Sequence, residues 1–268
     1  MSDIYLTIAD QTDETIEAIV ASMEARGTDP QMQRFCADYL GRVGRTGGAV
    51  VEIGCGNGVS SGEILRHLKP ECFIGIDPAE GLLRHAKKTF ADNDAVSFAV
   101  ADAYETDLEN ACCDVVVAHT IYSHLAEPER ALSEAFRILR PGGTLAIFDG
   151  DYAANTVALR ADDPLQEAMQ FAEKYLIHAP YIMRSLPALA KNAGFVQPDM
   201  GAHGFVQSKP ADYILSLMSR GLQAACNVKD LSQERADTLL REAHKRIEED
   251  RFYGAILFVS LILRKPEN

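Results

Sequence analysis

Residues 50–58 read Val-Val-Glu-Ile-Gly-Cys-Gly-Asn-Gly, so a short apolar run leads directly into three alternating glycines. An apolar run of this length is typical of a buried strand, and residues 61–69 continue with the spacing of a helix. Glycine adopts backbone conformations that are closed to other residues and lets a ligand approach the main chain. This stretch therefore predicts a strand, a ligand-binding turn and a helix.

The same alternation continues along the chain after residue 58. Further apolar runs and the helical patterns between them occupy residues 72–77, 80–90, 96–102, 114–119, 127–139 and 144–150. Near-continuous apolar strands that alternate with amphipathic helices indicate a parallel sheet covered on both faces. Right-handed crossovers then give an α/β protein with a doubly wound sheet. Residues 195–206 and 255–263 are two further strand candidates.

The pattern divides the chain into three units. Residues 1–46 are expected to form an N-terminal helical cap, and residues 47–210 together with 251–268 the core. The helical, charged residues 211–250 form a stretch that is too long for a hairpin loop. We expect this stretch to be an inserted lid that packs over one end of the sheet.

The charge balance excludes some classes of partner. The 268 residues include 26 lysines and arginines against 39 aspartates and glutamates, a formal net charge of −13. Such a surface repels phosphate backbones and anionic lipids, so a small molecule is favoured over nucleic acid or membrane. No secretory signal, zinc-ligand spacing or apolar run of ~18 residues is visible. We therefore expect a cytoplasmic monomer or homodimer without a metal.

The spacing of the glycines distinguishes between nucleotide ligands. A dinucleotide-binding turn has the pattern Gly-x-Gly-x-x-Gly. Here Gly54, Gly56 and Gly58 are each two residues apart, and Glu52 precedes them. A carboxylate at this place repels a pyrophosphate and attracts an ammonium or sulfonium group. Asp77, at the end of the second strand, can accept hydrogen bonds from both hydroxyls of a ribose.

Four stretches resemble the class I S-adenosylmethionine-dependent methyltransferases, specifically their ubiquinone/menaquinone-biosynthesis-like branch. They are VVEIGCGNG, GIDPAEGLLRHA, VSFAVADA and the run from Cys113 to Asp149, and they cover residues 49–149 in the family's order. The resemblance implies a Rossmann-like fold of seven strands, the last one antiparallel. It also implies S-adenosylmethionine as methyl donor and S-adenosylhomocysteine as product.

The resemblance further implies which residues hold the cofactor. The glycine turn holds the methionine part, the second strand's end the ribose and adenine, and the third strand's end the adenine edge. These residues are Glu52, Gly54, Cys55 and Gly56, then Asp77 and Pro78, then Asp102 and Ala103. The backbone carbonyl of His119 is expected to meet the ligand's amine. Arg34 is a candidate partner of the methionine carboxylate and Tyr5 a candidate cover, unless they are a surface arginine and a loop tyrosine.

Candidate acceptor residues follow the fourth and fifth strands. His119 is a candidate catalytic base because histidine titrates near neutrality, and Asp151 is a second. A structural role is the alternative for both. The substrate-binding candidates are Tyr122, His124, Asp149 and Tyr152, followed by His178, Tyr181 and Arg184 on one helical face. A structural role for His124, and packing of that helical face on the sheet, are again the alternatives.

These features predict transfer of a methyl group to an oxygen or nitrogen, less favourably a carbon, of a small metabolite or natural product. Two other functions stay open. One is a catalytically silent protein that binds S-adenosylmethionine as a partner or sensor, although the glycines and Asp77 are intact. The other is a nicotinamide-dependent reductase, which the glycine spacing and the lack of a Tyr-x-x-x-Lys motif disfavour.

Overall fold

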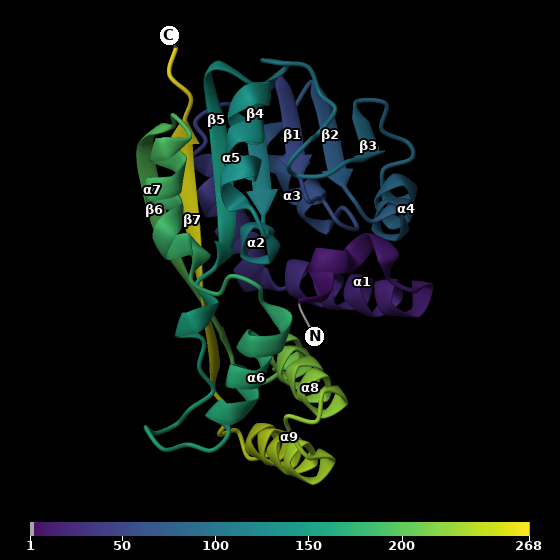
Figure 1. Ribbon diagram of the computed structural model, residues 1–268, viewed down its shortest axis with the longest axis vertical. Coiled ribbons are helices and arrows are strands. Elements are labelled where there is room, and N and C mark those ends of the chain that lie inside the picture. Colours follow the sequence, from purple (N-terminus) through teal and green to yellow (C-terminus); the bar gives the residue numbers. More distant parts are fainter. Residues whose placement is uncertain (1–2, 268) are drawn as a thin grey trace.

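The computed structural model describes residues 3–267 and is built on one seven-stranded sheet (Figure 1). The strand order is β3-β2-β1-β4-β5-β7-β6, and only β7 runs antiparallel to its neighbours. The predicted fold, with seven strands and an antiparallel last strand, is confirmed. The strands are β1 (Ala49–Ile53), β2 (Cys72–Asp77), β3 (Val96–Val100), β4 (Cys113–His119), β5 (Leu139–Gly150), β6 (Val196–Gln207) and β7 (Gly254–Arg264).

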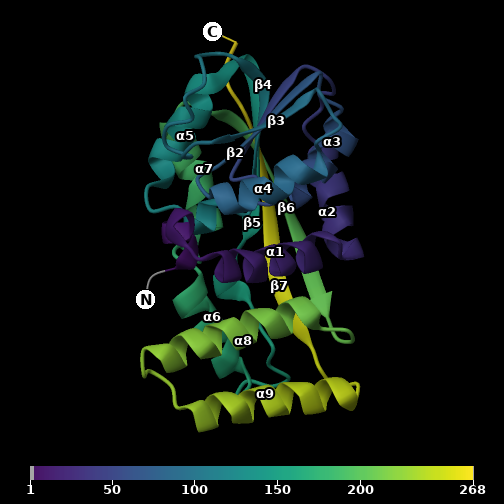
Figure 2. The ribbon, with the colours of Figure 1, turned by 90° about the vertical axis from the view of Figure 1, so that its right-hand side faces the viewer.

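Helices cover both faces of the sheet, so it is doubly wound (Figure 2). One face packs against α2 (Pro30–Gly41) and α3 (Val59–Leu68). The other packs against α5 (Pro128–Ile138) and α7 (Ile182–Asn192). Strand β4 is apolar at successive positions because both of its faces are buried. Val115 and Val117 pack in the hydrophobic core on the α2 and α3 side, and Val116 and Ala118 pack in the core on the α5 and α7 side. Helix α4 (Glu80–Thr89) connects β2 to β3.

Residues 4–27 cross the carboxyl ends of the strands (Figure 1). They form α1 (Asp13–Gly27), preceded by a short 3-10 segment, η1 (Ile4–Asp10). The side chain of Thr12 accepts a hydrogen bond from the backbone N–H of Thr15 and so begins α1. Asp29 begins α2 in the same way, with Pro30 at its first position. The two caps divide the N-terminal residues into separate helices.

A second group of helices lies beyond the same end of the sheet (Figure 1). Residues 211–250 contain α8 (Asp212–Asn227) and α9 (Gln233–Glu248), as the helical pattern predicts. They are joined by α6 (Gln166–Leu176), which comes from the segment after β5. Helix α8 approaches α6 so closely that a Cβ atom on Gly221 would overlap the backbone of Ala172. Among residues 3–267, no helix has the length and apolar character needed to cross a membrane.

Candidate cofactor and methyl-acceptor site

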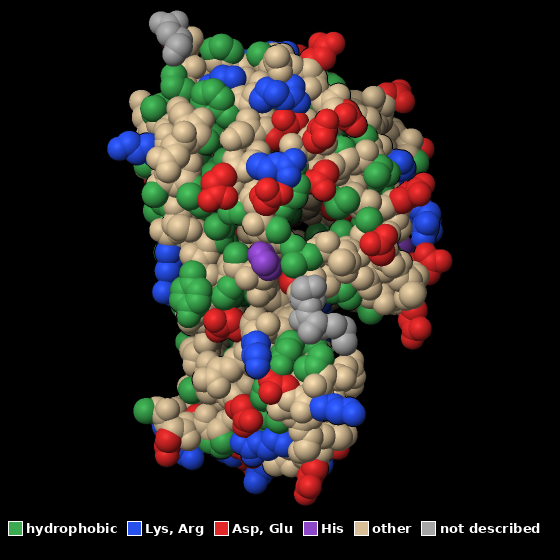
Figure 3. Space-filling model, in the orientation of Figure 1, with side chains coloured by type: hydrophobic (Ala, Val, Ile, Leu, Met, Phe, Trp, Pro, Cys, Tyr) green, Lys and Arg blue, Asp and Glu red, His purple; other side chains and the backbone are tan. Residues whose placement is uncertain are grey.

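A cavity of about 320 Å³ lies at the carboxyl ends of β1, β2 and β4. The face drawn in Figure 3 is hollowed near its centre, where the sheet meets the N-terminal residues. The chain order of the sheet reverses between β1 and β4, and ligands of open α/β sheets bind at such a point. The cavity volume lies within the range of small-molecule sites. Residues 5–10 of η1 close it on the side away from the sheet.

The glycine turn lets the main chain form one wall of this cavity. Gly54, Gly56 and Gly58 have φ angles of 71°, 55° and 84°, a region that favours glycine. A Cβ atom on Gly54 would overlap the side chain of Ile121. The N–H groups of Gly54 and Cys55 both donate to the carbonyl of Ile76, which fixes the turn to β2. The turn therefore presents bare backbone to a ligand.

Asp77 connects the end of β2 to the glycine turn. One carboxylate oxygen accepts from the Gly56 N–H at 2.9 Å, and the other accepts from the Ala79 N–H at 2.9 Å. Each oxygen keeps a lone pair, so two further donors can still bind. Burial raises the pKa of Asp77 to about 6. Pro78 lies beside Asp77 on the cavity wall.

The loop after β3 forms the neighbouring wall. Asp102 and Ala103 both line the cavity. Asp102 is exposed, and its carboxylate accepts from the Tyr104 N–H at 2.9 Å, which shapes the loop. The predicted ribose and adenine residues therefore meet the glycine turn around a single cavity.

Comparison with known proteins identifies the kind of protein that has this cavity. A family model described as a methyltransferase domain matches residues 51–147. A malonyl-[acyl-carrier protein] O-methyltransferase of Methylococcus capsulatus is 26% identical over 204 residues, which is 75% of this chain and 70% of the relative. Residues 51–147 are a methyltransferase domain, and the matches support the class I S-adenosylmethionine-dependent type.

The names of other similar proteins point to different acceptors. A demethylmenaquinone methyltransferase of Clavibacter sepedonicus is 28% identical over 117 residues, 41% of this chain and 47% of that one. A solved phosphoethanolamine N-methyltransferase 2 of Haemonchus contortus has a TM-score of 0.61 at 19% identity, covering 98% of this chain and 59% of that one. Several curated relatives are matched over only about half of their own length. The class is shown, and assignment to the menaquinone-like branch stays a prediction.

Glu52 lies behind the cavity wall of the methyltransferase. It is fully buried, its Oε2 accepts from the Ser61 hydroxyl at 2.5 Å, and it does not line the cavity. Its Oε1 is buried without a hydrogen-bond partner. An acceptor left without a donor under the glycine turn would suit a cofactor that brings an ammonium group. Direct contact with the cofactor, as the sequence predicted, stays a prediction.

The burial of Glu52 has a measurable effect on stability. Burial raises its pKa from 4.5 to about 7, so the folded protein holds this proton more tightly than the unfolded chain. The free energy of unfolding therefore falls as pH rises from about 4.5 through 7. The free energy of unfolding of Glu52→Gln, measured by urea unfolding between pH 5 and 8, should therefore fall by about 3 kcal/mol less than that of the wild type. Glu71→Gln, an exposed control, should keep the wild-type slope, and equal slopes for Glu52→Gln and wild type would contradict the expectation.

Arg26, rather than the predicted Arg34, lines the cavity. Arg34 is exposed on α2 and does not line the cavity. Arg26 lines it and donates to the hydroxyl of Thr120 at 2.9 Å. The two lie eight residues apart on different helices, and the turn between α1 and α2 directs only Arg26 toward the cavity. Tyr5 lies on the cavity wall as expected.

His119 lines the cavity at the end of β4, but its surroundings make it a weak base. Its Nδ1 is 3.0 Å from the Tyr39 hydroxyl, and its ring stacks on Phe148 at 4.8 Å. Burial, and then the charge of Arg26, lowers the pKa of His119 to about 3. A neutral imidazole with this pKa accepts a proton poorly at neutral pH. The geometry therefore favours a structural role for this side chain.

His124, unlike His119, has a carboxylate partner on one ring nitrogen. It lines the cavity, and its Nδ1 forms a short hydrogen bond with a carboxylate oxygen of Asp3, which is itself buried. The same carboxylate accepts from the N–H groups of Tyr5 and His178, both at 3.0 Å. The Tyr5 and His124 rings lie 4.3 Å apart. Sequence reasoning missed Asp3, because no pattern links residue 3 to residue 124.

Most other acceptor candidates lie away from the cavity. Asp151 is bound by Arg184, whose Nε lies 2.9 and 3.0 Å from its two oxygens. Asp149 is fully buried, and its carboxylate accepts hydrogen bonds from the backbone N–H and the hydroxyl of Ser123. It therefore supports the loop that carries His124. The predicted acceptor residues that do not line the cavity are Asp151, Tyr122, Asp149, Tyr152, His178, Tyr181 and Arg184. His178, Tyr181 and Arg184 line a separate shallow hollow.

Proposed function

We propose that this protein transfers a methyl group from S-adenosylmethionine to an oxygen or nitrogen of a small molecule. The carrying observation is the shared cavity of Asp77, Asp102 and the glycine turn at the carboxyl ends of the strands. When bound, the cofactor supplies an activated methyl group on a sulfonium. Asp77 would hold the ribose, and Arg26 would bind the methionine carboxylate. Residues 5–10 would exclude water from the reacting atoms.

His124 is the residue that we propose as proton acceptor. Its Nδ1 is held by Asp3, which leaves Nε2 as the ring nitrogen that can accept a proton. A buried carboxylate on one ring nitrogen fixes the tautomer and stabilises the imidazolium that forms. Asp3 acts through His124 and is a positioning residue. Helices α6, α8 and α9 would form the lid over the acceptor.

Methyl transfer is testable without knowing the acceptor. The purified protein is incubated with S-adenosylmethionine that carries a tritiated methyl group and with a panel of small alcohols, phenols, amines and carboxylic acids. Tritium in an extracted product supports the proposal. Binding of S-adenosylhomocysteine without transfer to any panel member or cell metabolite extract would instead favour the silent binding protein.

Asp3→Ala should separate positioning from binding. We expect methyl transfer to fall by about 100-fold with unchanged binding of S-adenosylhomocysteine, because the base loses its fixed tautomer. Nitrogen-15 NMR should show the Nδ1–H tautomer of His124 in the wild type and a mixture in the variant.

Two comparisons check this role. His124→Ala and the double variant with Asp3→Ala should be equally slow, because the two residues act as a unit. Asp13→Ala, on the exposed first turn of α1, should leave transfer unchanged. Additive losses in the double variant, or an unchanged tautomer in Asp3→Ala, would contradict the proposed role.

A further inference from the structure

Two arginines, of which Arg26 lines the cavity and Arg220 does not, have no acidic partner. Arg26 lies near the end of α1, and Arg220 lies on α8. Neither forms an ion pair with any of residues 3–267, although the net charge of the chain is −13. The Nε atom of each is buried and has no hydrogen-bond partner. A buried donor without an acceptor costs about 1–3 kcal/mol, so a ligand that supplies the acceptor gains that energy.

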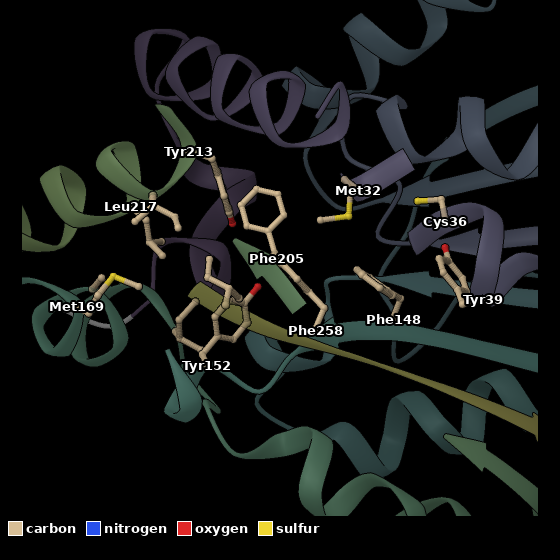
Figure 4. Packing of buried hydrophobic residues seen from close by; sticks show 14 of the residues in the cluster. Met32, Cys36, Tyr39, Phe148, Tyr152, Met169, Phe205, Tyr213, Leu217 and Phe258 are labelled. Atoms are coloured by element: carbon tan, nitrogen blue, oxygen red, sulfur yellow. The ribbon is translucent and has the colours of Figure 1, made fainter. Parts of the chain in front are cut away.

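Three tyrosines accompany these arginines. The guanidinium carbon of Arg26 lies 5.9 Å from the centre of the Tyr213 ring. Tyr213 and Arg220 are seven residues apart on α8, which places them on the same face of the helix, two turns apart. In Figure 4 the hydroxyl groups of Tyr152 and Tyr213 point toward one another. Tyrosine hydroxyls and guanidinium groups together are well suited to an oxyanion.

Tyr5 connects this cluster to the proposed base. Its ring centre lies 4.3 Å from that of His124. Burial raises the pKa of Tyr5, and the charges of Arg220 and Arg26 oppose that rise. Of this cluster of Tyr5, Tyr152, Tyr213, Arg26 and Arg220, only Tyr5 and Arg26 line the cavity, and Arg26 connects the cavity wall to Tyr213.

The cofactor accounts for only one of the two arginines. It carries a single carboxylate, and Arg26, which lines the cavity beside Thr120, is placed to receive it. Arg220 is left without an anion. We infer that the methyl acceptor is an acidic small molecule whose carboxylate or phosphate group binds Arg220 among these tyrosines. This inference rests on the proposed function, since it describes the acceptor of the same site.

Binding of simple acids to the protein saturated with S-adenosylhomocysteine tests the inference. The probes are benzoate, phenyl phosphate and the neutral benzamide, with dissociation constants measured by ligand-observed NMR. Both acids, or one of them, should bind at least tenfold more tightly than benzamide. Preference for benzoate or phenyl phosphate then identifies carboxylate or phosphate as the recognised group.

Variants at Arg220 locate the binding. Arg220→Gln should weaken the binding of the acids at least tenfold, and Arg220→Lys should keep part of that binding. Arg241 is exposed on α9, so the control variant Arg241→Gln should bind the acids as the wild type does. Equal binding of benzamide and the acids, no binding of any probe, or unchanged acid binding in Arg220→Gln would overturn the inference. Failure of S-adenosylhomocysteine itself to bind would contradict the proposed function, and this outcome is distinct from a failure of the acids to bind.

Discussion

Asp77→Asn should weaken the binding of S-adenosylhomocysteine by about 100-fold. Hydrogen bonds to a charged group contribute roughly 1.5–3 kcal/mol each, and the carboxylate of Asp77 has room for two ribose hydroxyls. Loss of about 3 kcal/mol corresponds to the stated change in dissociation constant. The asparagine amide would also oppose the N–H of Gly56 or Ala79, because it replaces one acceptor by a donor. Isothermal titration calorimetry measures the change directly.

The effect of Asp77→Asn needs a control for loss of charge alone. Asp92→Asn removes one negative charge from an exposed turn after α4 and should bind as the wild type does. Circular dichroism shows whether both variants are folded. If folded Asp77→Asn bound S-adenosylhomocysteine within threefold of the wild type, the ribose would not be held at β2.

Asp163→Asn should lower the free energy of unfolding by about 3 kcal/mol, because Arg246 stays buried and keeps only Glu242 as a charged partner. The side chains of Asp163 and Arg246 are 0% and 5% exposed, and two hydrogen bonds of 2.8 and 2.7 Å join them. They tie α9 to the segment that leads into α6. These hydrogen bonds lower the pKa of Asp163, so its stabilisation is present above about pH 4 and is lost at lower pH. Urea unfolding at pH 7 measures the loss.

Two further variants define what that result means. Asp162→Asn, in the exposed pair with Arg160, should change stability by less than about 0.5 kcal/mol. Replacing both members, as Asp163→Leu with Arg246→Met, should be less destabilising than Asp163→Asn alone, because no buried charge remains. An Asp163→Asn variant as stable as the wild type would show that the pair does not hold α9 to the segment before α6.

The strands were predictable because each has a local signal. Buried parallel strands are apolar on both faces, so β1, β2 and β4 appear in the sequence as nearly continuous apolar runs. The glycine turn and Asp77 were predictable for a related reason, since strand ends of a parallel sheet meet at one edge. These positions follow from short-range patterns and from the rule that orders such sheets.

The acceptor side was much less predictable, because chain segments far apart in sequence form it. Asp3 reaches His124 across 121 residues, and Arg26 rather than Arg34 faces the cavity because a capped turn reorients the chain at Asp29. His178, Tyr181 and Arg184 have helical spacing, but periodicity does not say which end of the sheet a helix face meets. Arg184 contacts Asp151 instead.

A crystal structure of the protein grown with S-adenosylhomocysteine tests the central claim most directly. The account predicts that the ligand fills the 320 Å³ cavity, with its ribose hydroxyls on Asp77 and its amino acid part along the turn of Gly54 and Gly56. It also predicts the carboxylate of the ligand on Arg26. A ligand bound elsewhere, or one in this cavity that leaves Asp77 without a contact, would contradict the account.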